Sequence, residues 1–126
     1  MSALKKLDPW LPPLVLMAVI FYFSAQPNLN SGLGWIDHVG RKIIHASEYA
    51  LLCFLWWRAL RTVMDRVRAL APAWTIASLY AASDEFHQRF TTGRQSTWVD
   101  WAIDSMGAAL FVVLALRTIR SRELTR

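Results

Sequence analysis

The sequence predicts an all-α protein, a four-helix transmembrane bundle whose N- and C-termini are both cytoplasmic. Hydrophobic residues make up 55% of the 126 positions, and the chain contains seven Trp, which is rich for so small a soluble protein. Four apolar runs are separated by short polar or basic segments. Within these runs polar side chains recur at i, i+4 and i+7, the spacing of one helical face.

Charge and cysteine content disfavour two other classes of protein. The net charge of +5 is compatible with nucleic-acid binding, since basic faces attract phosphate. The arginines, however, lie in short clusters between apolar runs and form no recognition-helix pattern, so no nucleic-acid partner is expected. The single cysteine, Cys53, excludes an internal disulfide and any multi-cysteine zinc site.

The first helix is expected at about residues 10–25. Pro12 and Pro13 fall in its first turn, where no intrahelical donor is lost. At about 1.5 Å per residue the run is roughly 24 Å long, slightly less than the hydrocarbon thickness of a bilayer. Lys5 and Lys6 precede it as in a signal peptide, but bulky residues at 21–23 replace the small ones of a cleavage site, so we expect an uncleaved anchor.

The other helices are expected at about residues 42–60, 70–90 and 97–119, each polar in only one half. The second helix is polar in its first half, the third in its second half and the fourth in its first half. Residues 28–34 and 91–93 are expected to be loops, and the basic tail after residue 117 to be frayed. Short connections force spanning helices to alternate in direction, so all three polar halves should lie at one membrane face.

The orientation in the membrane follows from the Lys and Arg residues. Of the fourteen, ten are expected at the face opposite the polar halves, and an excess of basic residues marks the cytoplasmic side. These ten are Lys5, Lys6, Arg58, Arg61, Arg66, Arg68, Arg117, Arg120, Arg122 and Arg126. The polar halves should therefore open on the external side.

Residues 83–107 concentrate ionisable groups between two apolar runs. Such groups at membrane depth are costly unless paired or hydrated, so they indicate a functional site. The candidate catalytic residues, suited to acid and base chemistry, are His45, Glu48, Asp84 and Asp104. The candidate ligand-binding residues are Lys42, Tyr49, Glu85, Gln88, Arg89, Arg94 and Asp100. Of these, Arg89 and Arg94 lie nearer the rim and suit a bidentate grip on phosphate or carboxylate.

Two less functional interpretations of these residues stay open. The charges could serve only to neutralise one another and fix helix register, and His87 is expected to face water.

Pairs such as His45 with Glu48 have the one-turn spacing of di-metal carboxylate sites, but such pairs are common by chance. No cofactor is therefore expected, with a divalent metal as the minor alternative. Gly107 is expected to let two helices approach closely.

Three segments resemble the VanZ-like family of small bacterial membrane proteins. The segments are KIIHASEYALL from Lys42, DEFHQRFTTGR from Asp84 to Arg94, and DWAIDSMG from Asp100 to Gly107. The Ser-Ala-Gln-Pro sequence at residues 24–27 fits as well, and the resemblance covers about residues 21–114. The most specific part is the pattern Asp-Glu-x-x-Gln-x-Phe-x-x-x-Arg.

The resemblance implies one compact VanZ-like transmembrane domain over residues 1–126, in the inner membrane of a bacterium. It also implies a link to the cell envelope, because the family's namesake confers low-level resistance to the glycopeptide teicoplanin. One departure affects the site. Where the family commonly has Asn, four residues after the Asp of the last helix, this chain has Asp104, which adds an acid.

Three functions are compatible with this pattern. The first is a binding protein whose outward polar pocket engages an anionic lipid headgroup or a lipid-linked cell-wall precursor and modulates glycopeptide susceptibility. The second is a membrane enzyme, a hydrolase or transferase, that uses the carboxylates and His45 on a lipid-linked substrate. The third is a structural polar network in a membrane scaffold. Membrane lipids or lipid-linked precursors are the expected partners.

Overall fold

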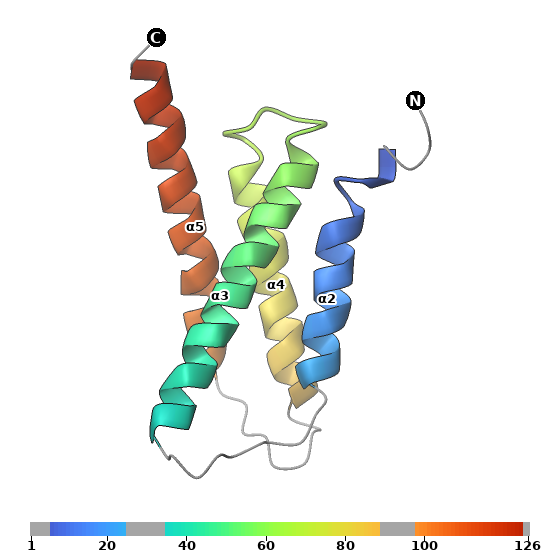
Figure 1. Ribbon diagram of the computed structural model, residues 1–126, viewed down its shortest axis with the longest axis vertical. Helices are drawn as coiled ribbons and strands as arrows, with labels where there is room; N and C mark the ends of the chain where they lie inside the picture. The colour runs from blue at the N-terminus through green and yellow to red at the C-terminus, as the bar shows by residue number, and fades with distance from the viewer. Residues whose placement is uncertain (1–5, 25–34, 89–97, 125–126) are drawn as a thin grey trace.

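Four long helices form the computed structural model, which describes residues 6–24, 35–88 and 98–124. They are α2 (Leu11–Ser24), α3 (Trp35–Leu60), α4 (Leu70–Gln88) and α5 (Trp98–Leu124), labelled as in Figure 1. No strand occurs in these three ranges, so the predicted all-α class is confirmed. Successive helices alternate in direction, and α2 begins at the end of the bundle where α5 finishes (Figure 1).

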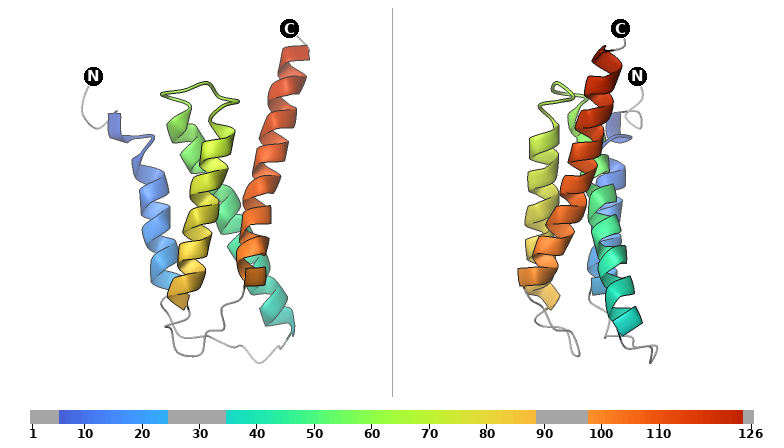
Figure 2. Two further views of the ribbon diagram at one scale, coloured as in Figure 1. Left: turned by 180° about the vertical axis from the view of Figure 1, so that it is seen from behind. Right: turned by 90° about the vertical axis from the view of Figure 1, so that its left-hand side faces the viewer.

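The pair α3 and α4 forms the centre of the bundle. Each of these two helices packs against the other three. Figure 2 shows α2 on one side of the pair and α5 on the other. The start of α3, the end of α4 and the start of α5 therefore meet at one end of the molecule.

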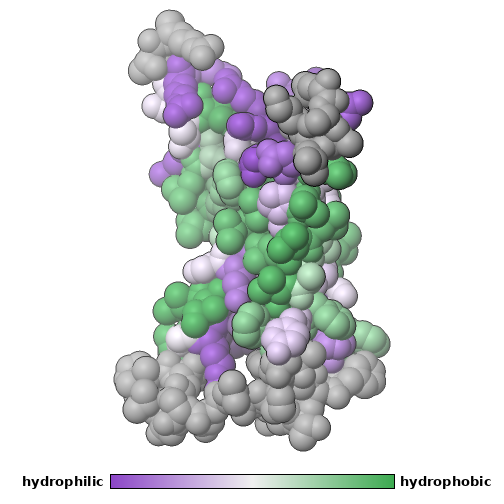
Figure 3. All heavy atoms as spheres, turned by 45° about the vertical axis from the view of Figure 1, so that its right-hand side comes forward, coloured by the Kyte–Doolittle hydropathy of each residue, from purple (hydrophilic) through white to green (hydrophobic). Residues whose placement is uncertain are grey.

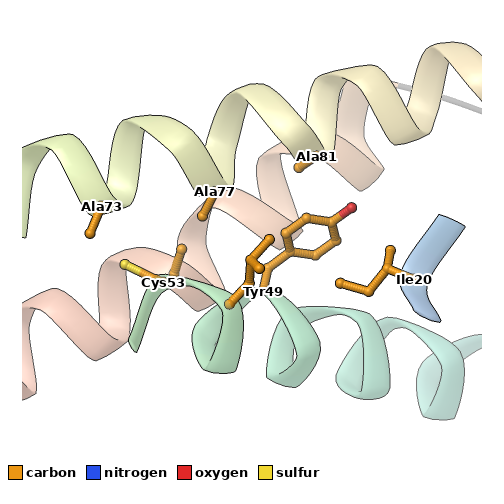
Figure 4. Close-up of a cluster of buried hydrophobic side chains, with 8 residues drawn as sticks. Ile20, Tyr49, Cys53, Ala73, Ala77 and Ala81 are labelled. Carbon is orange, nitrogen blue, oxygen red and sulfur yellow. The ribbon is translucent and has the colours of Figure 1, made fainter. Parts of the chain in front are cut away.

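Small side chains bring α4 close to α3. Ala73, Ala77 and Ala81 recur every four residues, so they lie on one face of α4, and all three are fully buried. Figure 4 shows them facing Tyr49 and Cys53 of α3. Small residues allow the two backbones to approach, which increases the van der Waals contact between the helices.

The crossing of α5 over α3 is closer still, at Gly107. A Cβ atom on this residue would lie 2.4 Å from the backbone oxygen of Ala46, a distance that real Cβ atoms essentially never show. Gly107 thus permits close helix approach, as the sequence predicts.

Two helices extend further than predicted. α3 begins at Trp35 rather than near residue 42, and α5 continues to Leu124 rather than ending near residue 119. The predicted limits followed the apolar runs, whereas helix formation also accommodates charged residues outside those runs. Arg66, between α3 and α4, pairs at 3.3 Å with Glu123 in the last turn of α5. The prediction of a frayed tail is therefore wrong as far as residue 124.

Large apolar side chains lie on the outside of all four helices. Phe21, Ile44, Leu79 and Leu110, one from each helix, are all more than half exposed. In Figure 3 these apolar surfaces occupy the middle of the molecule, and hydrophilic residues gather towards both ends.

One helix of the described ranges, α5, is long and apolar enough to cross a membrane, and the segment Leu11–Phe23 is apolar but shorter. A single such helix is weak evidence, because the core helix of a soluble protein passes the same test. A soluble core helix is mostly buried, however, and only 17% of the apolar window in α5 is buried.

Candidate functional site

The polar halves of α3, α4 and α5 meet at one end of the bundle. The deepest polar side chains there are Tyr49, Asp84 and Asp104, one from each helix, which are 0%, 4% and 2% exposed. Around them lie further side chains that the sequence singled out. We define the polar cluster as Lys42, His45, Glu48, Tyr49, Asp84, Glu85, Asp100 and Asp104.

Two contacts form the outer part of the polar cluster. The ammonium group of Lys42 donates to Oδ1 of Asp100, which joins α3 to α5 across half-buried positions. Nδ1 of His45 lies 3.9 Å from Oε2 of Glu48, one turn further along α3. The second distance is that of a loose ion pair rather than of a hydrogen bond.

Asp104 lies among the other carboxylates of the polar cluster. Its charged neighbours are Glu48, Asp84, Glu85 and Asp100, which come from all three helices. Like charges repel strongly where water is excluded, so this arrangement favours the approach of cations and hydrogen-bond donors. Oδ2 of Asp104 is buried and accepts no hydrogen bond from any residue within the described ranges.

Comparison with known families decides what kind of protein carries this cluster. Residues 10–120, most of the chain, match the family model described as VanZ/LLP1. The chain belongs to the VanZ-like family. The resemblance seen in the sequence is thereby confirmed, and the matched range includes every residue of the polar cluster. Searches of curated proteins and of solved structures each found no match.

Several hydrogen bonds beside the polar cluster of this VanZ-like protein join α4 to α5. They were not predicted from the sequence. The hydroxyl groups of Ser78 and Ser105 lie 2.9 Å apart and join α4 to α5. The indole of Trp74 donates to the carbonyl of Ser105, and the indole of Trp101 donates to that of Ser78, both at 3.1 Å. Small polar residues within apolar helices are the available sequence signal, since they often bond across helix pairs in membranes.

The end of α2 is attached to α4 beside the polar cluster. The hydroxyl group of Tyr80 donates to the backbone carbonyl of Met17. One turn beyond the cluster, the ring of His87 stacks on that of Phe21, with 4.3 Å between centroids. His87 is thus half-buried against α2 rather than simply facing water.

Some predicted site residues lie outside what the structure describes. Arg89 and Arg94 fall in the stretch 89–97, and the side chain of Gln88 is likewise outside the description. The two arginines follow the end of α4 and precede the start of α5 in the chain.

The described side chains of the polar cluster are not arranged to bind a metal ion. Across residues 6–24, 35–88 and 98–124, no group of three or more His, Cys, Asp or Glu side chains is placed to hold a metal ion. The cluster can still accept hydrogen bonds from hydroxyl or ammonium groups. His45 and Glu48 can also exchange a proton with a bound molecule, since both are common acid and base groups.

Proposed function

We propose that this VanZ-like protein is a multi-pass protein of the bacterial cytoplasmic membrane. In this proposal its polar cluster opens to the outside and binds an anionic lipid headgroup or a lipid-linked cell-wall precursor. The observation that carries it is the burial of Tyr49, Asp84 and Asp104 between three helices with apolar outer surfaces. Ionisable groups in such surroundings are costly and are therefore usually retained for a function.

The apolar exterior supports a membrane location for all four helices. Exposed side chains such as Leu14, Ile43, Leu79 and Met106 would contact water in a soluble bundle. Large apolar patches of this kind mark surfaces that meet lipid or another protein. In a bilayer the same side chains would face acyl chains, and the hydrophilic ends in Figure 3 would face the headgroups.

The ligand class follows from the charges that the three helices bring together. Arg89 and Arg94 lie in the chain between the helices that carry Asp84 and Asp100, and in this proposal they grip the phosphate. The carboxylates, including the open oxygen of Asp104, would accept from hydroxyl or amine groups of the same headgroup. A phosphate with attached hydroxyl or amine groups matches both sets of residues.

A membrane enzyme is the second candidate, favoured by the pair of His45 and Glu48 at 3.9 Å. The pair is half-buried beside Asp84 and could act as general acid and base on a lipid-linked ester or phosphate. Under this proposal Glu48→Gln would abolish turnover and leave binding intact. Under the binding proposal the same variant would weaken ligand binding and activity in cells together.

Native mass spectrometry tests the binding proposal. The wild-type protein, extracted from bacterial membranes, should retain a lipid that carries phosphate. In nanodiscs containing a polyprenyl phosphate at a few per cent, Arg94→Gln should lose most of that retained lipid. The matched control is Arg122→Gln, which removes an arginine from the opposite end of the bundle and should behave as wild type. Equal retention by the two variants would exclude the proposed phosphate contact.

The structural alternative predicts a different outcome in the same experiment. If the cluster only holds the helices together, Glu48→Gln, Asp84→Asn and Arg94→Gln should lower the yield of folded protein without changing the lipids retained. A role in glycopeptide susceptibility would appear as a change in the inhibitory concentration of teicoplanin when the protein is expressed. Arg94→Gln should remove that change if it depends on the polar cluster.

A further inference from the structure

The end of the bundle opposite the polar cluster carries a second charged surface. It includes residues 61–69, which connect α3 to α4, and the last turns of α5 (Figure 1). Two acids at this end are paired within the protein. Asp8 accepts from Arg58 at 3.0 Å, and Glu123 accepts from Arg66 at 3.3 Å.

The third acid at this end is occupied by the backbone of the connection. Oδ2 of Asp65 accepts from the backbone amides of Val67 at 3.0 Å and of Arg68 at 3.2 Å. These bonds satisfy amide groups just before α4 begins. Asp65 therefore acts as a local cap and pairs with none of the basic side chains described around it.

Four arginines at this end have no acidic partner, and we call them the basic rim. They are Arg61, Arg68, Arg117 and Arg120. All four are exposed, and no carboxylate in the described part of the chain lies within ion-pair distance of them. Arg117 and Arg120 lie about 9 Å and 4.5 Å along the α5 axis from Glu123, which contacts the connection through Arg66.

Apolar side chains alternate with the basic ones on the connection. Val63, Met64 and Val67 are 70%, 36% and 41% exposed. They lie between Arg61 and Arg68 in a segment of nine residues, 61–69, that faces outward from the bundle. Surfaces that mix arginine with exposed aliphatic groups are typical of the boundary between headgroups and acyl chains.

The connection is held in one conformation by hydrogen bonds. The amides of Val63 and Met64 donate to the carbonyl of Leu60 at 3.0 and 3.1 Å. The indole of Trp57 donates to the carbonyl of Arg66 at 2.7 Å, and the guanidinium of Arg61 lies 4.8 Å above the same indole ring. A preorganised surface loses little conformational entropy on binding, so more of its interaction energy appears as affinity.

We propose that the basic rim and the apolar side chains beside it form a docking surface for anionic phospholipids. The phosphate groups of the lipids pair with Arg61, Arg68, Arg117 and Arg120, and the aliphatic side chains of the connection enter the upper acyl region. This surface lies at the opposite end from the polar cluster and goes beyond the function proposed for it.

Charge alone would also suit a nucleic acid, but the neighbouring residues favour a lipid. Val63, Met64 and Val67 would remain in water beside a bound nucleic acid, whereas a membrane surface covers them. Leu11 and Leu14 of α2 are also more than half exposed and begin the apolar exterior next to this end. In Figure 3 apolar residues fill the middle of the molecule, directly next to the hydrophilic residues of its upper end.

Quenching of tryptophan fluorescence by brominated lipid tests the proposal. The full-length protein is reconstituted in phosphatidylcholine bilayers with increasing brominated phosphatidylglycerol, and quenching gives the relative association constant of the two lipids. Wild type should prefer phosphatidylglycerol, and the preference should weaken as salt is raised. The variant Arg68→Gln/Arg117→Gln/Arg120→Gln should lose about fivefold per arginine removed, the effect expected for a basic side chain near an anionic surface.

The control keeps the charge at each position. Arg68→Lys/Arg117→Lys/Arg120→Lys should retain most of the preference for phosphatidylglycerol. The same comparison is repeated in an Arg94→Gln background, where lipid bound at the polar cluster should be lost, so the effect of the rim arginines is measured apart from the proposed ligand site. Absence of any preference in wild type, or an unchanged preference in the glutamine variant, would overturn the proposal. Salt-sensitive binding of polyuridylic acid by the detergent-solubilised protein, lost in the glutamine variant, would instead assign the rim to nucleic acid.

Discussion

The two ends of the bundle hold their charges in different ways. In the polar cluster, carboxylates from three helices lie close together, and Asp84, Glu85 and Asp104 are each less than 10% exposed. At the basic end, the paired side chains of Arg66 and Glu123 are 39% and 58% exposed. Water can therefore replace a lost partner at the basic end but not in the polar cluster.

This difference separates two uses of charge. Removing one member of a buried pair leaves the other without compensation, which costs far more than the pair contributes. Exposed pairs contribute little, because solvent screens them and side-chain entropy opposes them. We expect substitutions around the polar cluster to change stability and ligand binding together, and substitutions at the basic end to change lipid preference with little effect on stability.

The largest expected effect comes from the helix crossing that holds the polar cluster together. Gly107→Ala places a Cβ atom 2.4 Å from the backbone oxygen of Ala46, so α5 must move away from α3. We expect a loss of about 2–3 kcal/mol in unfolding free energy, in the range of overpacked cores. Titration with a denaturing detergent, followed by circular dichroism, measures it.

Gly40→Ala is the matched control for this substitution. A Cβ atom there meets nothing within 4 Å, and Gly40 lies in the same helix as Ala46. Alanine is the better helix former, so this variant should gain up to about 1 kcal/mol. Equal stability of the two glycine variants would contradict the close approach of α5 to the backbone of α3 at Gly107.

The next effect concerns the charge of Asp104. Asp104→Asn keeps the shape of the side chain and removes one carboxylate from the neighbourhood of four others. Weaker repulsion should raise the unfolding free energy by about 1–2 kcal/mol, since unpaired buried charges are destabilising. The same detergent titration measures it, with Asp8→Asn as the control at the exposed end, where no gain is expected.

A loss of stability in Asp104→Asn would point the other way. It would mean that a cation or a hydrogen-bond donor already compensates this carboxylate in the membrane. Repeating the titration after removal of bound lipid would then show whether the compensation comes from the ligand of the proposed site.

Much of this contrast could be predicted from the sequence, because it depends on coarse features. Apolar runs predicted the order of the helices, and short connections predicted their alternation. The position of the polar residues in each run predicted that Lys42 and Asp100, which form an ion pair, lie at the same end of the bundle. These inferences need only the direction of each helix and the rise per residue.

The remaining features depend on how each helix is rotated about its axis. Three hydrogen bonds between α4 and α5 form only when each helix is turned so that the bonding side chains face the other helix. They are the hydrogen bond between the hydroxyl groups of Ser78 and Ser105 and those donated by the indoles of Trp74 and Trp101. An apolar helix with an apolar exterior has little hydrophobic asymmetry, so its sequence does not indicate which side faces its neighbour. The early start of α3 was missed for a related reason, since residues 35–41 are helical without being apolar.

A smaller effect is expected from the ion pair between Lys42 and Asp100. A double-mutant cycle with Lys42→Met and Asp100→Asn should give a coupling free energy of about 1 kcal/mol, because both side chains are only about one-quarter exposed. The loss of unfolding free energy in the double variant should therefore be smaller than the sum of the losses in the two single variants. Additive effects would show that the two groups do not interact in the membrane.

The smallest effect is expected from the matching cycle at the basic end. Arg66→Gln and Glu123→Gln remove a pair of 3.3 Å whose side chains are 39% and 58% exposed, so the coupling should not exceed about 0.5 kcal/mol. Salt at about 0.5 M should abolish it, whereas the coupling of Lys42 with Asp100 should persist because those groups are less accessible to ions. If the exposed pair proved as strongly coupled as the half-buried one, burial would not be what distinguishes the two ends. The last turn of α5 would then owe its order to this pair, and its loss should also shorten the helix detectably by hydrogen exchange.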